Sequence, residues 1–97
     1  MDREQVRAAR GLLGWSQEDL AERAGVNRRV VAAFESGTSV PHQRNLDRLR
    51  AVIESAGVEL VSRKNGTIGV VIGSDALDRV RTGAFPTTQV DDPKAGS

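Results

Sequence analysis

The sequence predicts a mainly α-helical domain of four to five helices with a C-terminal β-hairpin. Apolar residues recur at helical spacing through residues 2 to 56, and each such stretch follows a capping residue. After Gly57 the composition changes to β-branched residues around Asn65-Gly66, a strong hairpin signal. With 97 residues, the chain has the usual size of one compact domain.

The first helix is expected to begin after Asp2, because Asp2 and Gln5 have the spacing of a capping box. Its apolar face consists of Val6, Ala9 and Leu13. Gly14 is expected to end it, since glycine readily adopts the left-handed conformation that follows many helices.

The second helix has the clearest start signal in the chain. Ser16 is followed three residues later by Asp19, and Trp15 lies at the right distance to pack on Leu20 as a hydrophobic staple. Gly25 is expected to end this helix. The next start signal follows at once, because Asn27 is a good N-cap for a third helix.

The third helix should stop near Ser36-Gly37, and residues 38–41 should form a loop. A fourth, amphipathic helix ended by Gly57 is indicated by Leu46, Leu49, Val52, Ile53 and Ala56. The hairpin should span Val58 to Ile72. A short last helix, capped by Ser74-Asp75, should follow and run through Arg81. Residues 83–97, with two prolines and few apolar residues, are predicted to form a flexible tail.

Composition excludes several classes of chemistry. The chain has no cysteine and a single histidine, His42, so it has no disulfide framework, no thiolate zinc site and no multi-histidine metal site. We recognise no nucleophile–base pair and no glycine-rich phosphate loop. We therefore expect no enzyme activity and no cofactor. Without a signal peptide or a membrane span, a cytoplasmic protein is expected, with no membrane partner.

Two short helices joined through Ala24-Gly25-Val26, the second with its own cap, are what a helix-turn-helix requires. Residues 16–37, SQEDLAERAGVNRRVVAAFESG, closely resemble the Cro/CI (Xre) family of helix-turn-helix regulators. The resemblance covers roughly residues 3 to 60 and includes the S-Q-x-x-L-A, A-G-V and F-E-x-G elements at the family's spacing. It implies a lambda-repressor-like fold and DNA binding. The expected division is residues 1–57 as the DNA-binding unit, 58–82 as a candidate dimerisation element and 83–97 as the tail.

Base contacts are expected on one face of the third helix. Periodicity turns Val31 and Phe34 inward and places Arg28, Arg29, Ala32 and Ala33 on the opposite face. Arginine is the usual bidentate partner of guanine in the major groove, so Arg28 and Arg29 are the main candidates for reading bases. Ala33 lies where the family often has a longer polar side chain. The plainer alternative is that the two arginines form a solvated charged face.

Phosphate contacts are expected around the third helix, where donors cluster. The candidates are Gln17, Asn27, Ser36, Thr38, Ser39, His42 and Arg44. Charge supports this placement: residues 23–50 carry six arginines against Glu35 and Asp47, a local charge of +4 that the whole-chain value of +1 hides. The family resemblance further implies a structural ion pair between Arg10 and Glu35.

The function indicated is sequence-specific binding of double-stranded DNA by a transcriptional repressor or autoregulator. A homodimer reading a near-palindromic operator is expected, because one recognition helix covers only a few base pairs. The hairpin could extend a sheet across the two-fold axis or simply cover its own helices. The main alternative is a protein-interaction module of the same fold, an antitoxin or antiactivator that sequesters a regulatory protein.

Overall fold

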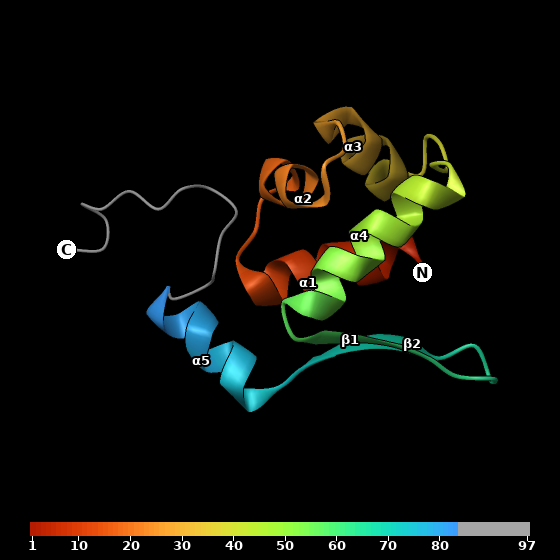
Figure 1. Ribbon diagram of the computed structural model, residues 1–97. Helices are drawn as coiled ribbons and strands as arrows, with labels where there is room; N and C mark the ends of the chain where they lie inside the picture. The colour runs from red at the N-terminus through yellow and green to blue at the C-terminus, as the bar shows by residue number, and fades with distance from the viewer. Residues whose placement is uncertain (84–97) are drawn as a thin grey trace, which may run out of the picture.

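The computed structural model describes residues 1–83 and confirms the mainly helical fold with a hairpin (Figure 1). The elements are α1 (Arg3–Leu13), α2 (Gln17–Ala24), α3 (Arg28–Ser36), α4 (Gln43–Ser55), β1 (Val58–Ser62), β2 (Ile68–Ile72) and α5 (Ser74–Thr82). The predicted tail lies outside the described residues, apart from Gly83. Among residues 1–83 no helix is long and apolar enough to cross a membrane.

The helix boundaries follow the predicted caps. At the start of α2, the Ser16 Oγ accepts from the Asp19 N–H and the Asp19 Oδ2 accepts from the Ser16 N–H, both at 2.9 Å. The Asn27 side chain accepts from the Arg29 N–H at 2.8 Å, which fixes the start of α3. Left-handed glycines end the first three helices at Gly14, Gly25 and Gly37.

The last helix begins one residue earlier than expected. The sequence placed the cap at Ser74-Asp75, but the N-cap is Gly73, and no side chain caps it. Ser74 already has helical geometry, so its hydroxyl is not at the cap position, and Asp75 lies in the first turn, where a negative charge favours the helix dipole. The helix also continues to Thr82, one residue beyond Arg81.

The apolar core lies between α1, α2, α3 and α4 and continues onto the hairpin. In Figure 1, α2 and α3 lie on one side of α1 and α4, and the hairpin lies on the other. The buried residues of the core are Val6, Ala9, Leu13, Trp15, Leu20, Ala21, Ala24, Val31, Phe34, Leu49, Ile53 and Val58. Leu46, Val52 and Ala56 of the predicted apolar face are only partly buried against this core.

The hairpin is antiparallel, with Val58 opposite Ile72 and Ser62 opposite Ile68. The Arg63 N–H donates to the Thr67 carbonyl at 2.8 Å, which closes a three-residue loop. Gly66, at φ +90°, takes the backbone conformation that this loop needs. One face of the hairpin, including Val58, Leu60, Val70 and Ile72, packs on the helices, while Glu59 and Val71 are exposed.

Gln5 fastens the hairpin to α1. Its side chain is buried, and its Nε2 donates to the Val61 carbonyl at 2.8 Å and to the Gly69 carbonyl at 3.0 Å. Its Oε1 accepts from the Asp2 N–H at 2.9 Å, as the capping box predicted. One amide therefore caps α1 and binds both strands, and its buried polar atoms are satisfied.

Gly57 joins α4 to β1 where α5 crosses. Its φ is +101°, and a Cβ at this position would lie 2.3 Å from the Cβ of Ala76, a buried residue of α5. The absence of a side chain therefore lets α5 dock.

We predict that Gly57→Ala destabilises the protein more than Gly66→Ala. Both substitutions put a side chain at positive φ, but a Cβ at Gly66 would meet nothing within 4 Å. The difference isolates the clash with α5, which should cost about 1–3 kcal/mol in the free energy of unfolding. Urea denaturation of the two variants measures it. Equal midpoints would mean that α5 shifts without cost.

Candidate nucleic-acid interface

The α2–turn–α3 unit is held in a fixed shape by its backbone and by apolar packing. The Val26 N–H donates to the Ala21 carbonyl at 3.0 Å across the glycine turn. Leu20 and Ala21 of α2 are buried together with Val31 and Phe34 of α3, as periodicity predicted. Because Val31 and Phe34 point into the core, the opposite face of α3 points to solvent.

The outward face of α3 has two cationic residues and two small ones. Arg28 and Arg29 are exposed, and within residues 1–83 their guanidinium groups have no hydrogen-bond or ion-pair partner. Ala32 and Ala33 are half-buried on the same face. This face can therefore donate to acceptors while the helix backbone approaches a ligand closely.

Other arginines have partners inside the protein. Arg50 pairs with Glu54 at 3.1 Å, and Arg48 donates to the Gly25 carbonyl at 3.4 Å. Arg23 lies over the Trp15 ring, 4.5 Å from its centroid. These contacts distinguish the guanidinium groups of α3 from those that serve the fold.

The predicted phosphate donors fall into two groups. Ser39, His42 and Arg44 are exposed, in the loop and first turn of α4, and their side chains are unpartnered within residues 1–83. Ser36 and Thr38 are already engaged: their hydroxyl oxygens are 2.7 Å apart, and the Ser36 Oγ also donates to the Ala33 carbonyl at 3.2 Å. A phosphate would have to replace these bonds to use those two hydroxyls.

Gln17 and Asn27 also have structural contacts. The Gln17 Nε2 donates to the Glu35 Oε1 at 3.1 Å, so one amide hydrogen is used inside the protein and the other remains. The Asn27 Oδ1 caps α3, which leaves its amide nitrogen free to donate.

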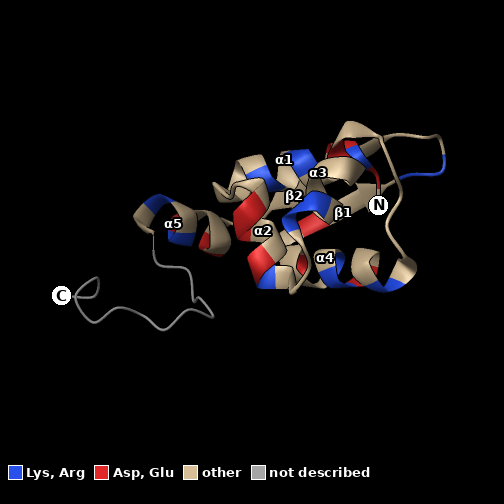
Figure 2. Cartoon of the chain, turned by 90° about the horizontal axis from the view of Figure 1, so that it is seen from above, with Lys and Arg blue, Asp and Glu red and all other residues tan. Residues whose placement is uncertain are grey.

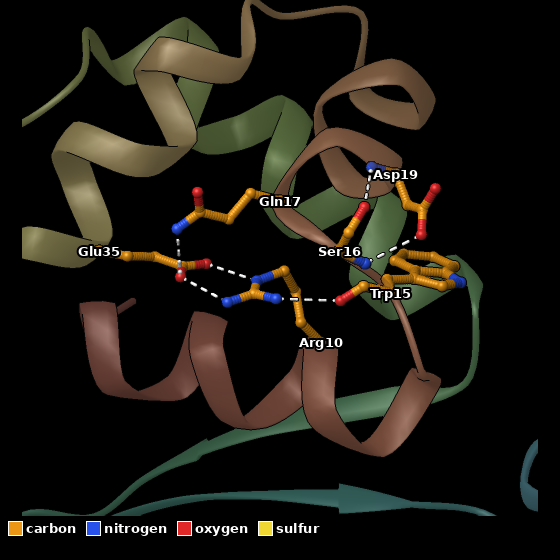
Figure 3. A network of polar contacts seen from close by, with 6 residues as sticks. All are labelled: Arg10, Trp15, Ser16, Gln17, Asp19 and Glu35. Carbon is orange, nitrogen blue, oxygen red and sulfur yellow. Dashed lines mark hydrogen bonds and ion pairs between the residues drawn. The ribbon is translucent and has the colours of Figure 1, made fainter.

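Arg10 and Glu35 form a bidentate ion pair (Figure 3). The Arg10 Nε and a terminal nitrogen each donate to one Glu35 oxygen at 2.7 Å. The remaining terminal nitrogen donates to the Trp15 carbonyl at 3.0 Å. The Glu35 residue is only 3% exposed, so its charge is compensated almost entirely by Arg10 and Gln17.

The hydrogen bond to Glu35 raises the pKa of the Arg10 guanidinium above its usual value, against an opposing effect of burial. A raised arginine pKa contributes stability at every pH below the unfolded-state value and loses it only above that value. The Arg10 charge is therefore constant across neutral pH.

This pairing also sharpens the charge pattern around α3. The acidic residues between positions 23 and 50 are Glu35 and Asp47. The Glu35 charge is neutralised by Arg10, which lies outside this range. Figure 2 shows that α2, in contrast, is marked by acidic segments. The positive surface is thus centred on α3 and α4 and not on α2.

An open hollow of about 280 Å³ lies beside α3. Its lining includes Arg29 and Ala33 of α3 together with Val40, Pro41 and His42, which precede α4. Val40 is 78% exposed. The sequence singled out Arg29, Ala33 and His42 separately but missed Val40, for which the only available signal was a valine directly before a proline in a polar loop.

The fold and its exposed helix define a helix-turn-helix protein of the DNA-binding regulator class. A family model described as helix-turn-helix matches residues 6–56, more than half of the chain. The chain belongs to this family, the Cro/CI (Xre) helix-turn-helix regulators. No curated protein matches the sequence.

We predict that Arg10→Met lowers the free energy of unfolding by about 3–5 kcal/mol, because the Glu35 charge would be left buried without its partner. The double variant Arg10→Met, Glu35→Met should lose less, since it strands no charge. Chemical denaturation at neutral pH measures both effects.

Arg50→Met is the matched control, because it breaks the exposed Arg50–Glu54 pair and should cost less than about 1 kcal/mol. Similar losses in Arg10→Met and Arg50→Met would show that burial of Glu35 does not determine the energy of its ion pair.

Proposed function

We propose that this protein is a transcriptional repressor and autoregulator that binds a near-palindromic DNA operator as a homodimer through α3. The observation that carries the proposal is the outward face of α3, where Arg28 and Arg29 have no internal partner beside the small Ala32 and Ala33. A helix occupying the major groove of a promoter excludes other proteins from the same site, which favours repression.

The chemistry of that face suits base edges. Arginine donates two parallel hydrogen bonds to the O6 and N7 of guanine, and small residues allow the helix to enter the groove deeply. Arg28 and Arg29 occupy the first turn of α3, the end of a recognition helix that contacts bases. Around it, Arg44, His42 and Ser39 would contact phosphates and fix the helix in register.

The length of α3 explains why a dimer is needed. Nine residues extend roughly 13 Å, which matches about four base pairs of duplex. So short a site carries little sequence information. Two copies related by a two-fold axis would read half-sites about 34 Å apart.

The outer edge of β2 is our candidate for the dimer contact. Its sequence, Ile-Gly-Val-Val-Ile, has no charged residue, whereas charges normally protect exposed edges from pairing. Within residues 1–83, β2 pairs with β1 alone.

Pairing of two antiparallel β2 edges would place the two-fold axis perpendicular to a four-stranded sheet. Both helical layers would then lie on the same side of that sheet. Since α3 lies across α1 and α4 from the hairpin (Figure 1), the two recognition helices would face the same DNA duplex.

The test is binding to a fluorescent duplex from the region upstream of the protein's own gene, at about 50 and 200 mM salt, against an unrelated duplex. We expect preference for the upstream duplex and weaker binding at the higher salt. Absence of any DNA affinity even at 50 mM would reject the proposal and favour a protein partner.

We predict that Arg28→Ala and Arg29→Ala each weaken binding to the preferred duplex by about 1–3 kcal/mol and leave stability unchanged. Arg81→Ala, an exposed arginine on α5 far from α3 in Figure 1, is the control and should bind like the wild type. Unchanged affinity in both α3 variants would remove them from base reading.

We predict that Val71→Lys converts the dimer to a monomer at micromolar concentration, because a lysine on β2 disfavours edge pairing. Val71 is 52% exposed, so the fold should tolerate the change. Glu59→Lys, directly opposite on β1, is the matched control and should remain dimeric. Sedimentation velocity distinguishes these results, and a dimeric Val71→Lys variant would exclude the β2 edge.

A further inference from the structure

Val40 is an apolar side chain that is exposed to solvent beside α3, the proposed DNA-binding helix. Exposed to 78%, it is more exposed than the other large exposed hydrophobic residues of the described chain, Val71 at 52% and Ile68 at 38%. A single exposed valine is ordinary by itself. This one, however, forms a wall of the hollow that Arg29 and Ala33 of α3 also line.

The loop holds Val40 in a restricted conformation. The Thr38 and Ser39 N–H groups donate to the Ala33 carbonyl at 2.9 and 3.3 Å, which fastens the loop to the end of α3. Pro41 restricts the backbone of the preceding Val40 to extended conformations, and the branched side chain has few rotamers. A contact made by Val40 therefore costs little conformational entropy.

The lining of the hollow combines apolar residues with a cationic one. Val40, Pro41 and Ala33 provide apolar surface, and Arg29, whose guanidinium is unpartnered within residues 1–83, also lines the hollow. In the major groove of unmodified DNA, the apolar group on a base edge is the 5-methyl of thymine, and the preferred partner of arginine is guanine. Methylated cytosine carries the same 5-methyl group.

We propose that Val40 is a specificity-determining residue that contacts the 5-methyl group of a pyrimidine next to the guanine bound by Arg29. This inference rests on the proposed function, because it requires α3 to lie in the major groove. It adds to α3 a reading position on the following loop. Ala33, which also lines the hollow, is small enough to leave the methyl group room.

The test begins with selection of binding sites from a random-sequence duplex library by the full-length protein. In the selected duplex, each thymine is then replaced singly by uracil, and each cytosine by 5-methylcytosine. Affinities are measured for the wild type, Val40→Ala and Val80→Ala. The last variant is the matched control, since it removes the same atoms from a partly buried valine of α5, an element that lies away from α3 in Figure 1 and outside the β2 edge.

We expect removal of one methyl group beside the guanine to weaken wild-type binding about fourfold, the effect of burying one carbon group of that size. Val40→Ala should lose this discrimination, and Val80→Ala should keep it. A response to thymine alone assigns the hollow to thymine, and a response to both bases assigns it to the 5-methyl group of either pyrimidine.

Two results would overturn the inference: no methyl-dependent change at any position, or the same change in the wild type and Val40→Ala. Its failure is distinguishable from that of the proposed function. If the wild type selects a sequence that Arg29→Ala alters and Val40→Ala does not, only the role of Val40 is rejected. If the wild type selects no sequence, both proposals are rejected.

Discussion

The structure depends above all on the buried charge of Glu35. A carboxylate that is 3% exposed must be compensated, and the compensation comes from two other helices: Arg10 of α1 in a bidentate pair and Gln17 of α2 through its amide. Because bidentate pairing tolerates little rotation, it fixes how α3 lies against α1 and α2. Polar contacts on the buried side of α3, as well as apolar packing, therefore determine which face of α3 points to solvent.

The same arrangement gives one residue type two kinds of role. Arg10 is surrounded by acceptors from Glu35 and Trp15 and serves the fold, while Arg28 and Arg29, one helix away, have no acceptor within residues 1–83. Pairing inside the protein also removes Glu35 from the surface charge, so the field around α3 is more positive than the residue count suggests.

Local signals were predictable from sequence and long-range contacts were not. The caps at Ser16 and Asn27 and the hairpin turn follow from residues a few positions apart, whose chemistry suffices. The start of α5 was misplaced by one residue, because adjacent glycine, serine and aspartate all suit a cap. Periodicity identified the outward face of α3. It could not show that Gln17 bonds to Glu35, or that Val40 shares a hollow with Arg29, since both depend on how separate elements pack.

Gln5 makes the hairpin part of the same cooperative unit as the helices. Its amide joins the first turn of α1 to Val61 of β1 and Gly69 of β2, which follow it by 56 and 64 residues in the chain. Opening the hairpin would leave this buried donor without acceptors. Slow hydrogen exchange in β1 and β2 should therefore accompany slow exchange in α1, as one foldon. The change from helix to strand after residue 57 is therefore bridged by hydrogen bonds that the first turn of α1 makes to both strands.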